Sequence, residues 1–483
     1  MAYNFQKPEL PFHLEVIPAA ATKPAGQIRL ELVSAPEKAD PGLPGPQAGD
    51  HILIQSGGQF KMLVSLGKSE KTILDTYRQA GGAAGKWLRQ SGTASAEFDI
   101  SVSNFEADSN SLQAFLEGLF LGAYQFSFYK EKKANEKPIL IYLRAEKATA
   151  RLKKFAERIE TLASIIYLER NWAHEPGNVI NPVSLAERLA ALAEYAGLKC
   201  TVLDVKELEK IGAGGLVNVG KGSQTPPHLI IIEYAGNQPP AQAKPVVLVG
   251  KALTFDSGGY SLKSTEGIQG MKYDKSGGIT VAATLLAAAE LKIKSPVVGI
   301  IAAAENMLSD KAYRPDDIIK TLSGKTIEIV TTDAEGRLVL ADALTYAQTH
   351  FQSAAIIDLA TLTGGVLVAL GRVRAGLMTN NEELAEKLLK SGEFTHERLW
   401  RLPLDEDYLK LIKGDDADLK NSGGREAPSI IGGIFIEQFI EDDRPWAHLD
   451  IAAVADLPKD APYNPKGATG FGIRLLVHFL ERF

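Results

Sequence analysis

The residues Asp333, Glu335 and Arg337 have the types and spacing that could do chemistry. They alternate with small residues and follow the apolar run 326–330. Because an extended backbone sends residues i, i+2 and i+4 to one side, we expect their side chains to converge at the end of a strand. Residues 338–350 are predicted to form a helix that contains no glycine or proline. A strand, a charged turn and a helix build a site at the carboxyl edge of the sheet in α/β enzymes. A solvated acidic turn that caps a helix is the alternative.

Two further segments bring charged groups to strand ends. Lys251 follows the apolar run 246–250, Asp256 comes five residues later, and Lys263 and Asp274 lie further along the chain. Each alone is typical of a charged surface, but with the carboxylates above they place four acidic groups near the turns of one sheet. Unpaired carboxylates in a dry cleft are very costly. We therefore expect two divalent cations, roughly 3.5 to 4 Å apart, that share bridging carboxylates and supply a hydrolytic water.

Other catalytic classes lack their signatures in this chain. None of the eight histidines lies in a His-Glu-x-x-His arrangement. The glycine before Lys251 lacks the second glycine of a phosphate-binding loop, and the Gly-x-Ser-x-Gly motif of serine hydrolases is missing.

Length and composition predict a soluble cytoplasmic protein of two domains. The 483 residues exceed one ordinary core, and 45% hydrophobic with 23% charged residues is ordinary for a globular chain. The single cysteine, Cys200, fits a reducing compartment. The amino terminus lacks the pattern of a secretory signal, and the longest apolar run, 297–304, is far below the roughly 20 residues that span a bilayer. The net charge of -6 argues weakly against a general polyanion binder.

Residues 1–147 are predicted to form a smaller α/β domain. They carry 16 basic and 16 acidic residues and no cluster of metal-type ligands. Segment 148–172 is charged and amphipathic without a breaker, which predicts a helix connecting two domains. The strands expected in the first domain are 12–17, 28–33, 51–55, 62–66, 98–102 and 139–143, and its helices are 69–80 and 111–123.

Residues 173–483 are predicted to form a larger catalytic domain. Asn181 and Pro182 have the cap and first-turn roles of a helix that Gly197 ends. The strands that follow are mostly apolar on both faces, which predicts a central, mostly parallel sheet covered by helices on both sides. The pair 229–234 and 246–251 is interpreted as an antiparallel hairpin at the sheet's edge. The expected strands are 201–203, 229–234, 246–251, 297–303, 326–331, 354–359 and 447–451.

Seven motifs stand in one order through the larger domain. They are Val-Gly-Lys at 249–251, Thr-Phe-Asp-Ser-Gly-Gly at 254–259, Ser-Leu-Lys at 261–263, Met-Lys-Tyr-Asp at 271–274, Thr-Asp-Ala-Glu-Gly-Arg-Leu at 332–338, Asp-Leu-Ala-Thr-Leu-Thr-Gly at 358–364 and Trp-Ala-His-Leu-Asp-Ile-Ala at 446–452. From about residue 165 to the end, the chain resembles the leucine aminopeptidase (cytosol aminopeptidase) family of dimetal exopeptidases. The first 150 residues resemble that family only in size and α/β character.

The resemblance implies a set of five metal ligands. Asp256 and Glu335 would bridge two divalent ions, Zn or Mn with Mg or Co as alternatives. Asp333 would complete the more loosely held site, and Lys251 and Asp274 the other. A lysine ligand must be neutral, so the dication has to displace a proton from an amine whose free pKa is about 10.4.

The resemblance also implies the catalytic pair Lys263 and Arg337. Lys263 would stabilise the oxyanion formed when the metal-bound water or hydroxide attacks the scissile carbonyl. The planar guanidinium of Arg337 suits bidentate binding of a bicarbonate ion that relays the proton. The free α-amine of a peptide substrate would bind one metal and Asp274, which restricts cleavage to the first residue.

The corresponding side-chain pocket is small, apolar and uncharged, and it favours leucine or another neutral side chain. For the methionine and the two alanines in it, core packing is the alternative interpretation. The implied pocket residues are Met271, Thr361, Leu362, Gly364, Ala452 and Ala455.

The chain departs from the family pattern at Thr331, where asparagine is usual, and at Pro428, where glycine is common. The resemblance further implies a homohexamer of two stacked trimers. Two other functions compete with a general aminopeptidase. One is an architectural DNA-binding role, against which the neutral first domain argues, and the other is a dipeptidase for cysteinylglycine.

Overall fold

The computed structural model describes residues 3–22, 28–34, 42–56, 59–68, 73–100, 109–131, 137–240 and 242–483. The chain has a mixed α/β fold that separates into two compact units. The larger unit comprises Met1–Gln6, Leu168–Asp456 and Ala468–Phe483, and the smaller unit comprises Lys7–Tyr167 and Leu457–Gly467. Helix α3 (Ala150–His174) runs from the smaller unit into the larger one. A domain division at residues 147 and 173 stays a prediction.

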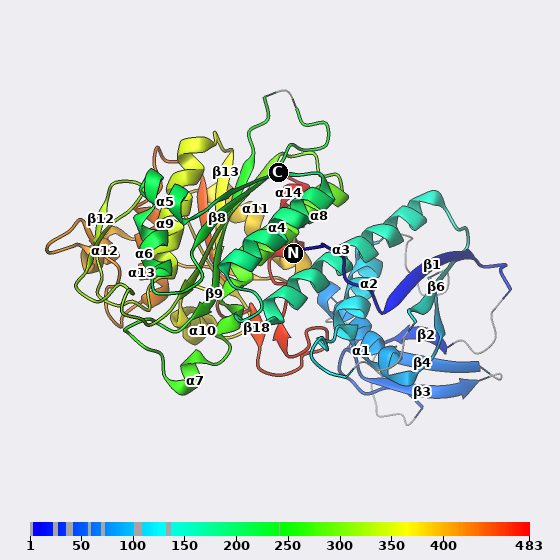
Figure 1. The fold of residues 1–483 in the computed structure, drawn as a ribbon. Coiled ribbons are helices and arrows are strands. Elements are labelled where there is room, and N and C mark those ends of the chain that lie inside the picture. The colour runs from blue at the N-terminus through cyan, green and yellow to red at the C-terminus, as the bar shows by residue number, and fades with distance from the viewer. Residues whose placement is uncertain are drawn as a thin grey trace. The chain divides into compact units, whose positions relative to one another are not determined.

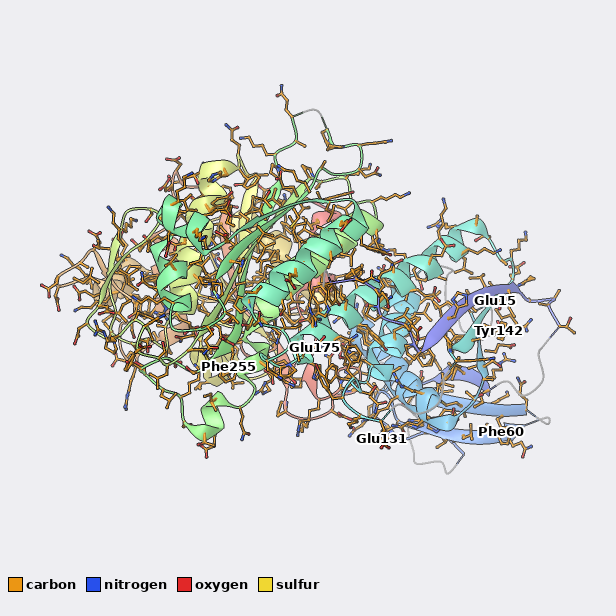
Figure 2. The ribbon with its side chains drawn as sticks, in the orientation of Figure 1. Glu15, Phe60, Glu131, Tyr142, Glu175 and Phe255 are labelled. Carbon is orange, nitrogen blue, oxygen red and sulfur yellow. The ribbon has the colours of Figure 1, made fainter. Side chains whose placement is uncertain are left out.

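The smaller unit is built on a six-stranded sheet with the order β1-β6-β5-β2-β4-β3, in which only the β3–β4 pair is antiparallel. On neighbouring strands, Glu15 lies opposite Tyr142 (Figure 2). Three helices supply residues to the apolar core of this unit, which is a cluster separate from that of the larger unit. The elements are β1 (Phe12–Pro18), β2 (Ile28–Val33), β3 (His51–Ser56), β4 (Gln59–Ser65), α1 (Leu74–Ser91), β5 (Ser95–Asp99), α2 (Asn110–Ala123) and β6 (Ile139–Ala145).

Three expected elements of the smaller unit have the wrong bounds, and one of them is the strand expected at 62–66, which is β4 and begins at Gln59. The helix expected at 69–80 continues to Ser91, and the strand expected at 98–102 is β5, which lies three residues earlier. The glycines after Ala80 do not break α1, because they allow it to approach α2 closely. A Cβ atom at Gly81 would lie 2.0 Å from the carbonyl oxygen of Phe115. Residues 69–72 and 101–102 lie outside the described residues.

The larger unit is built on an eight-stranded sheet with the order β15-β14-β17-β13-β9-β10-β8-β7. The four central strands β17, β13, β9 and β10 run parallel, and antiparallel pairs β14–β17, β10–β8 and β8–β7 flank them. The strands are β7 (Lys199–Leu203), β8 (His228–Tyr234), β9 (Val246–Asp256), β10 (Val297–Asn306), β13 (Ala355–Ala360), β14 (Ala375–Thr379), β15 (Leu399–Arg401) and β17 (Trp446–Asp450).

Helices cover both faces of this sheet, as its apolar strands predict (Figure 1). On one face, Val247 and Val249 of β9 share a core with α9 (Gly336–His350) and α6 (Gly214–Gly220). On the other face lie α8 (Ser276–Glu290) and α4 (Pro182–Ala196). Gly250 of β9 touches the start of α8 so closely that a Cβ atom would lie 2.5 Å from a backbone carbon.

The predicted ends of α4 are confirmed. The Asn181 side chain accepts a hydrogen bond from the Ser184 amide, Pro182 stands in the first turn, and Gly197 ends the helix with φ +65°. Such a left-handed cap residue is most often glycine.

Three strand assignments were wrong. The strand expected at 246–251 continues to Asp256, so Lys251 lies within β9 and not at its end. The segments that we expected to form a hairpin do not pair, because β10 lies between β8 and β9 and bonds to both. The strand expected at 326–331 is only β12 (Thr326–Glu328), and it belongs to a small separate sheet with β11 (Ile318–Lys320) and β16 (Leu419–Lys420). The apolar strand β9 pairs with a neighbouring strand on each of its two edges. The sequences of apolar strands do not say which strands lie side by side.

The remaining elements connect or cap these layers. Among the described residues, none of the helices combines the length and apolar composition that crossing a bilayer requires. The remaining elements that connect or cap the layers are α5 (Val205–Ile211), α7 (Thr265–Ile268), η2 (Met271–Lys275), α10 (Gly364–Leu370), α11 (Glu382–Thr395), α12 (Glu406–Leu409), η3 (Lys410–Ile412), α13 (Pro428–Glu437), β18 (Asp456–Leu457), β19 (Gly467–Ala468) and α14 (Ile473–Leu480).

Candidate metal centre and active site

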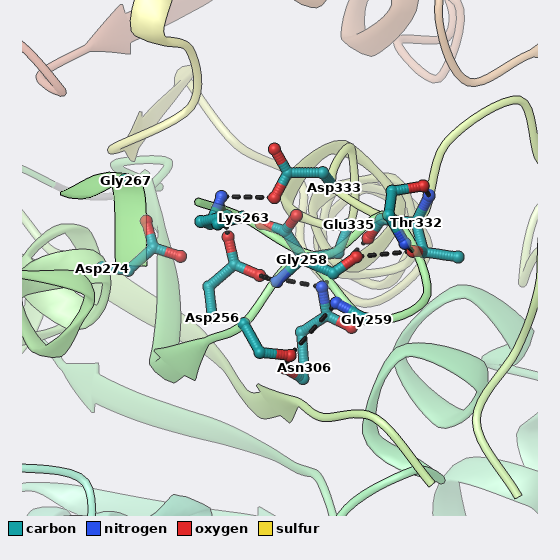
Figure 3. A network of polar contacts seen from close by, with 12 residues as sticks. Asp256, Gly258, Gly259, Lys263, Gly267, Asp274, Asn306, Thr332, Asp333 and Glu335 are labelled. Carbon is teal, nitrogen blue, oxygen red and sulfur yellow. Dashed lines mark hydrogen bonds and ion pairs between the residues drawn. The ribbon is translucent and has the colours of Figure 1, made fainter. Parts of the chain in front are cut away.

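Three carboxylates meet at the carboxyl edge of the central sheet. Asp256 ends β9, Asp333 lies in the turn before α9, and Glu335 is the last residue before that helix. One oxygen from each lies within 4.8 Å of the other two (Figure 3). Asp274, from η2, joins the same cluster through Lys251. Four acidic groups from three segments of the chain therefore belong to one cluster.

The predicted alternation of Asp333, Glu335 and Arg337 along a strand is wrong, although two of the three converge. The strand before them ends at Glu328, the carboxylates lie on a turn, and Arg337 lies in the first turn of α9. The hydroxyl of Thr331 accepts a hydrogen bond from the Asp333 amide at 3.2 Å, which helps to fix this turn. The turn, rather than strand periodicity, brings the carboxylates together.

Lys251 is buried in the middle of the acidic cluster. Its Nζ atom lies 3.0 Å from Asp274 Oδ1 and 2.9 Å from Glu335 Oε1, and it donates a hydrogen bond to the Thr361 carbonyl at 2.9 Å. Burial alone would lower the pKa of this amine, but the surrounding carboxylates outweigh burial and raise it. Gly336 leaves the space that Lys251 fills, because a Cβ atom there would lie 2.8 Å from Nζ.

Lys263 occupies the opposite, more open side of the cluster. Its Nζ atom lies 2.7 Å from Asp256 Oδ2 and also pairs with Asp333 (Figure 3). The loop before it turns through Gly258, whose φ of +85° favours glycine and whose amide donates to Asp256 Oδ1 at 2.9 Å. Lys263 thus pairs both with Asp256, a predicted shared ligand, and with Asp333, the predicted ligand of the more loosely held metal.

The cluster carries more negative charge than its two lysines balance. Burial raises the pKa of Asp274 to about 7 despite Lys251, and burial together with Glu335 raises the pKa of Asp333 to about 6. Asp274 Oδ2 and Glu335 Oε2 are buried and accept no hydrogen bond from the described residues. Buried oxygens without partners are costly, and divalent cations would satisfy them. The donor set therefore fits a pair of divalent metal ions.

Arg337 is the one predicted charged residue that does not join this network. It is buried and donates from Nη1 to the Asn421 carbonyl at 2.7 Å. Burial lowers the pKa of its guanidinium to about 10, although Glu335 and Asp450 oppose that shift. Its Nε has no hydrogen-bond partner among the described residues. A buried guanidinium with an unused donor can bind a small anion.

Sequence reasoning missed three polar residues that support the cluster. Asn306, at the end of β10, donates to Asp256 Oδ1 at 2.8 Å and to the Thr332 carbonyl at 3.0 Å. Tyr313 donates to the same carbonyl at 2.7 Å. The Asn421 side chain accepts from the Val330 amide at 2.8 Å. Only Asn306 has a signal in sequence, because it ends an apolar strand at the same edge.

Replacement of Asn306 by leucine should weaken metal binding. Leucine has nearly the same shape but removes the amide that holds Asp256. Loss of a residue that orients a ligand costs about 10- to 100-fold in metal affinity or activity. Titration of metal-depleted protein with Mn²⁺ or Zn²⁺ by calorimetry measures the change. Asn380→Leu serves as the control, because Asn380 bonds only to Arg444 and Trp446 among the hydrogen bonds of the described residues. Equal affinities for wild type and Asn306→Leu would contradict the role assigned to Asn306.

The predicted pocket residues come from three segments. The Thr361 hydroxyl donates to Asp274 Oδ1 at 2.7 Å, so this residue lies at the acidic cluster. Leu362 and Ala452 both donate their amides to one carboxylate, that of Asp450. The others begin η2, begin α10 and follow β17, and they are Met271, Gly364 and the buried Ala455.

A mixed sheet covered by helices, with carboxylates and lysines gathered at its carboxyl edge, defines the class of α/β metallohydrolases. The profile described as "Cytosol aminopeptidase family, catalytic domain" matches residues 167–477, and that of the family's N-terminal domain matches residues 51–133. The chain belongs to the cytosol aminopeptidase family, and it is a metallo-aminopeptidase.

Curated relatives and solved structures agree with this assignment. The "Probable cytosol aminopeptidase" of Geobacter sulfurreducens is 44% identical over 436 residues, which cover 89% of this chain and 86% of the relative. The protein of that name from Aquifex aeolicus is 43% identical over 88% of this chain and 85% of its own. The structure "Bottromycin maturation enzyme BotP in complex with Mn" matches with a TM-score of 0.86 at 30% identity, over 95% of this chain and 99% of that one. These relatives favour neither the DNA-binding nor the cysteinylglycine alternative.

Proposed function

We propose that this metallo-aminopeptidase releases neutral amino-terminal residues, leucine-like ones preferentially, from peptides. The observation that carries the proposal is the buried acidic cluster around Lys251, whose carboxylate oxygens outnumber their partners. The apolar, uncharged residues predicted to line the pocket support the preference for neutral side chains.

Five residues would hold the two metal ions. Asp256 and Glu335 would be shared, Asp333 would complete one site, and Lys251 and Asp274 the other. When bound, two divalent cations activate a water nucleophile and polarise the scissile carbonyl. Lys251 must lose its proton to become a ligand, so metal binding would release protons. The Mn complex of the BotP structure supports manganese, and zinc is the alternative that the donor set accepts equally, with magnesium and cobalt as further alternatives.

Lys263 and Arg337 would serve the reacting groups. Lys263 stands at the open side of the cluster, with a side chain only 16% exposed, where an ammonium can stabilise an oxyanion. The guanidinium of Arg337 would bind bicarbonate, which would accept and return the proton. Asp274 would receive the substrate's α-amine and limit cleavage to the first residue.

The cellular location, oligomeric state and partners of the enzyme are also proposals. The reducing compartment indicated by one cysteine supports a cytoplasmic location. The family resemblance supports a homohexamer, and the net charge of -6 supports peptides rather than nucleic acid as the partners.

Chelation should abolish peptide hydrolysis, and refilling with a divalent metal should restore it. Peptides with a free amino terminus should be cleaved, whereas amino-acetylated copies should not, because the amide cannot bind as an amine does. Release of the first residue from a Leu-Gly-Gly peptide and its acetylated copy measures both effects. Full activity after exhaustive chelation, or equal cleavage of the two peptides, would disprove the proposal.

A further inference from the structure

A single buried carboxylate joins the two loops that carry most of the predicted pocket. Asp450 ends β17 and is fully buried. Its Oδ1 accepts from the amides of Leu362 and Ala452, each at 3.2 Å, and its Oδ2 accepts from the Thr363 hydroxyl at 2.6 Å. Two donors come from the loop after β13 and one from the loop after β17.

The first of these loops also touches the acidic cluster. Thr361 donates its hydroxyl to Asp274 and accepts the Lys251 amine at its carbonyl. The Thr363 hydroxyl also lies 2.8 Å from that of Ser429, at the start of α13. Because Asp450 holds the two residues that follow Thr361, it fixes the loop between the metal ligands and the substrate side chain.

A second buried carboxylate, on the strand next to that of Asp450, has partners of a different kind. Asp358 of β13 is equally buried, but it bonds to Trp446 Nε1 at 2.8 Å and to His448 Nδ1 at 2.5 Å. Those partners belong to the neighbouring strand β17. Asp358 therefore ties strands of the sheet together, whereas Asp450 ties together the loops beyond it.

The donors of Asp450 would be left without partners if it were lost. An amide or hydroxyl buried without an acceptor costs free energy, and the loops would move to find other partners. Such movement would displace both walls of the pocket relative to each other. A displacement of this kind changes the discrimination between side chains more than it changes the chemistry common to all substrates.

We propose that Asp450 is a positioning residue that sets side-chain selectivity by holding the 361–363 and 451–455 loops together. The inference rests on the proposed function, since it takes these loops as the walls of the substrate pocket. It assigns Asp450 no contact with the substrate or the metals.

The test compares kcat/KM for alanyl, valyl and leucyl anilides in metal-loaded wild type, Asp450→Ala and Asp450→Asn. The leucyl-to-alanyl ratio should fall at least about 10-fold in Asp450→Ala, within the range that a pocket contributes through one or two methylene groups. Asparagine retains an oxygen acceptor for the two amides and should restore most of the ratio. Metal content should stay at the wild-type level in both variants.

Asp358→Asn is the matched control, because it alters a buried carboxylate of the same layer that does not bond to the loops. It should lower the melting temperature and keep the wild-type ratio. If Asp450→Ala does not fold, Thr363→Val removes the bonded hydroxyl and should lower the ratio, whereas Thr363→Ser should preserve it. An equal loss of kcat/KM for all three substrates in Asp450→Ala, or a wild-type ratio in Thr363→Val, would overturn the inference.

A binding measurement separates this inference from the proposed function. Calorimetry with leucine and alanine, the product amino acids, measures their affinity for the pocket in the absence of catalysis. An inactive wild type that still prefers leucine, and loses the preference in Asp450→Ala, would disprove the proposed function and support the inference. An active wild type whose binding preference is unchanged in Asp450→Ala would support the proposed function and overturn the inference.

Discussion

Glu335→Ala is expected to lose metal from both sites and to lose activity with it. Glu335 lies within reach of Asp256, Asp333 and Lys251, so its carboxylate is placed to serve both ions. Its loss also leaves Lys251 with one fewer buried partner. Because replacement of a residue that merely orients a ligand costs about 10- to 100-fold, loss of a shared ligand should cost more than about 100-fold in activity. Asp256→Ala should behave in the same way.

Elemental analysis after dialysis, with kcat/KM for a leucyl substrate, measures this prediction. Glu305→Ala is the matched control, because Glu305 is a carboxylate at the same edge whose partners are Ser223 and Thr225. It should keep both metals. Retention of two tightly bound metals per chain by Glu335→Ala or Asp256→Ala would show that the bridging assignment is wrong.

The positions of the acidic residues relative to the sheet could be predicted from sequence because short-range rules govern them. Asp256 ends an apolar strand, and the helix after Glu335 lacks breakers, so both residues lie near the carboxyl edge. The prediction that side chains alternate along an extended backbone at 331–337 was wrong, because the local backbone is a turn. Sequence periodicity describes only a regular backbone, and nothing local showed that the preceding strand is three residues long.

The rest of the site depends on contacts between distant segments. Lys251 is a ligand candidate only by resemblance, because a lysine that follows an apolar run in the sequence is ordinarily a surface charge. Its burial depends on the space that Gly336 leaves, 85 residues further on. Asn421 supports the 330–331 backbone from a segment that has no sequence signal for it. The order of β8, β10 and β9 in the sheet is likewise a choice among pairings that apolar strands allow equally.

Lys263→Ala and Arg337→Ala are expected to lower kcat while the protein still binds two metals. Lys263 pairs with two carboxylates from the open side, and Arg337 bonds to a backbone carbonyl, so neither belongs to the predicted ligand set. Removal of one group that stabilises an oxyanion costs on the order of 10² to 10³ in kcat. The loss should fall on kcat rather than KM, because negative charge develops on the carbonyl oxygen only during the reaction.

Bicarbonate distinguishes the two variants. Added bicarbonate should stimulate wild type and Lys263→Ala but not Arg337→Ala, because only the last lacks the guanidinium proposed to bind the anion. Lys272→Ala is a control for nonspecific charge loss, since Lys272 lies two residues before Asp274 and bonds to no cluster carboxylate among the ion pairs of the described residues. The deciding measurement is metal content beside kcat for each variant. Metal loss in proportion to activity loss would assign both residues a structural role, and a wild-type kcat in either variant would remove that residue from the mechanism.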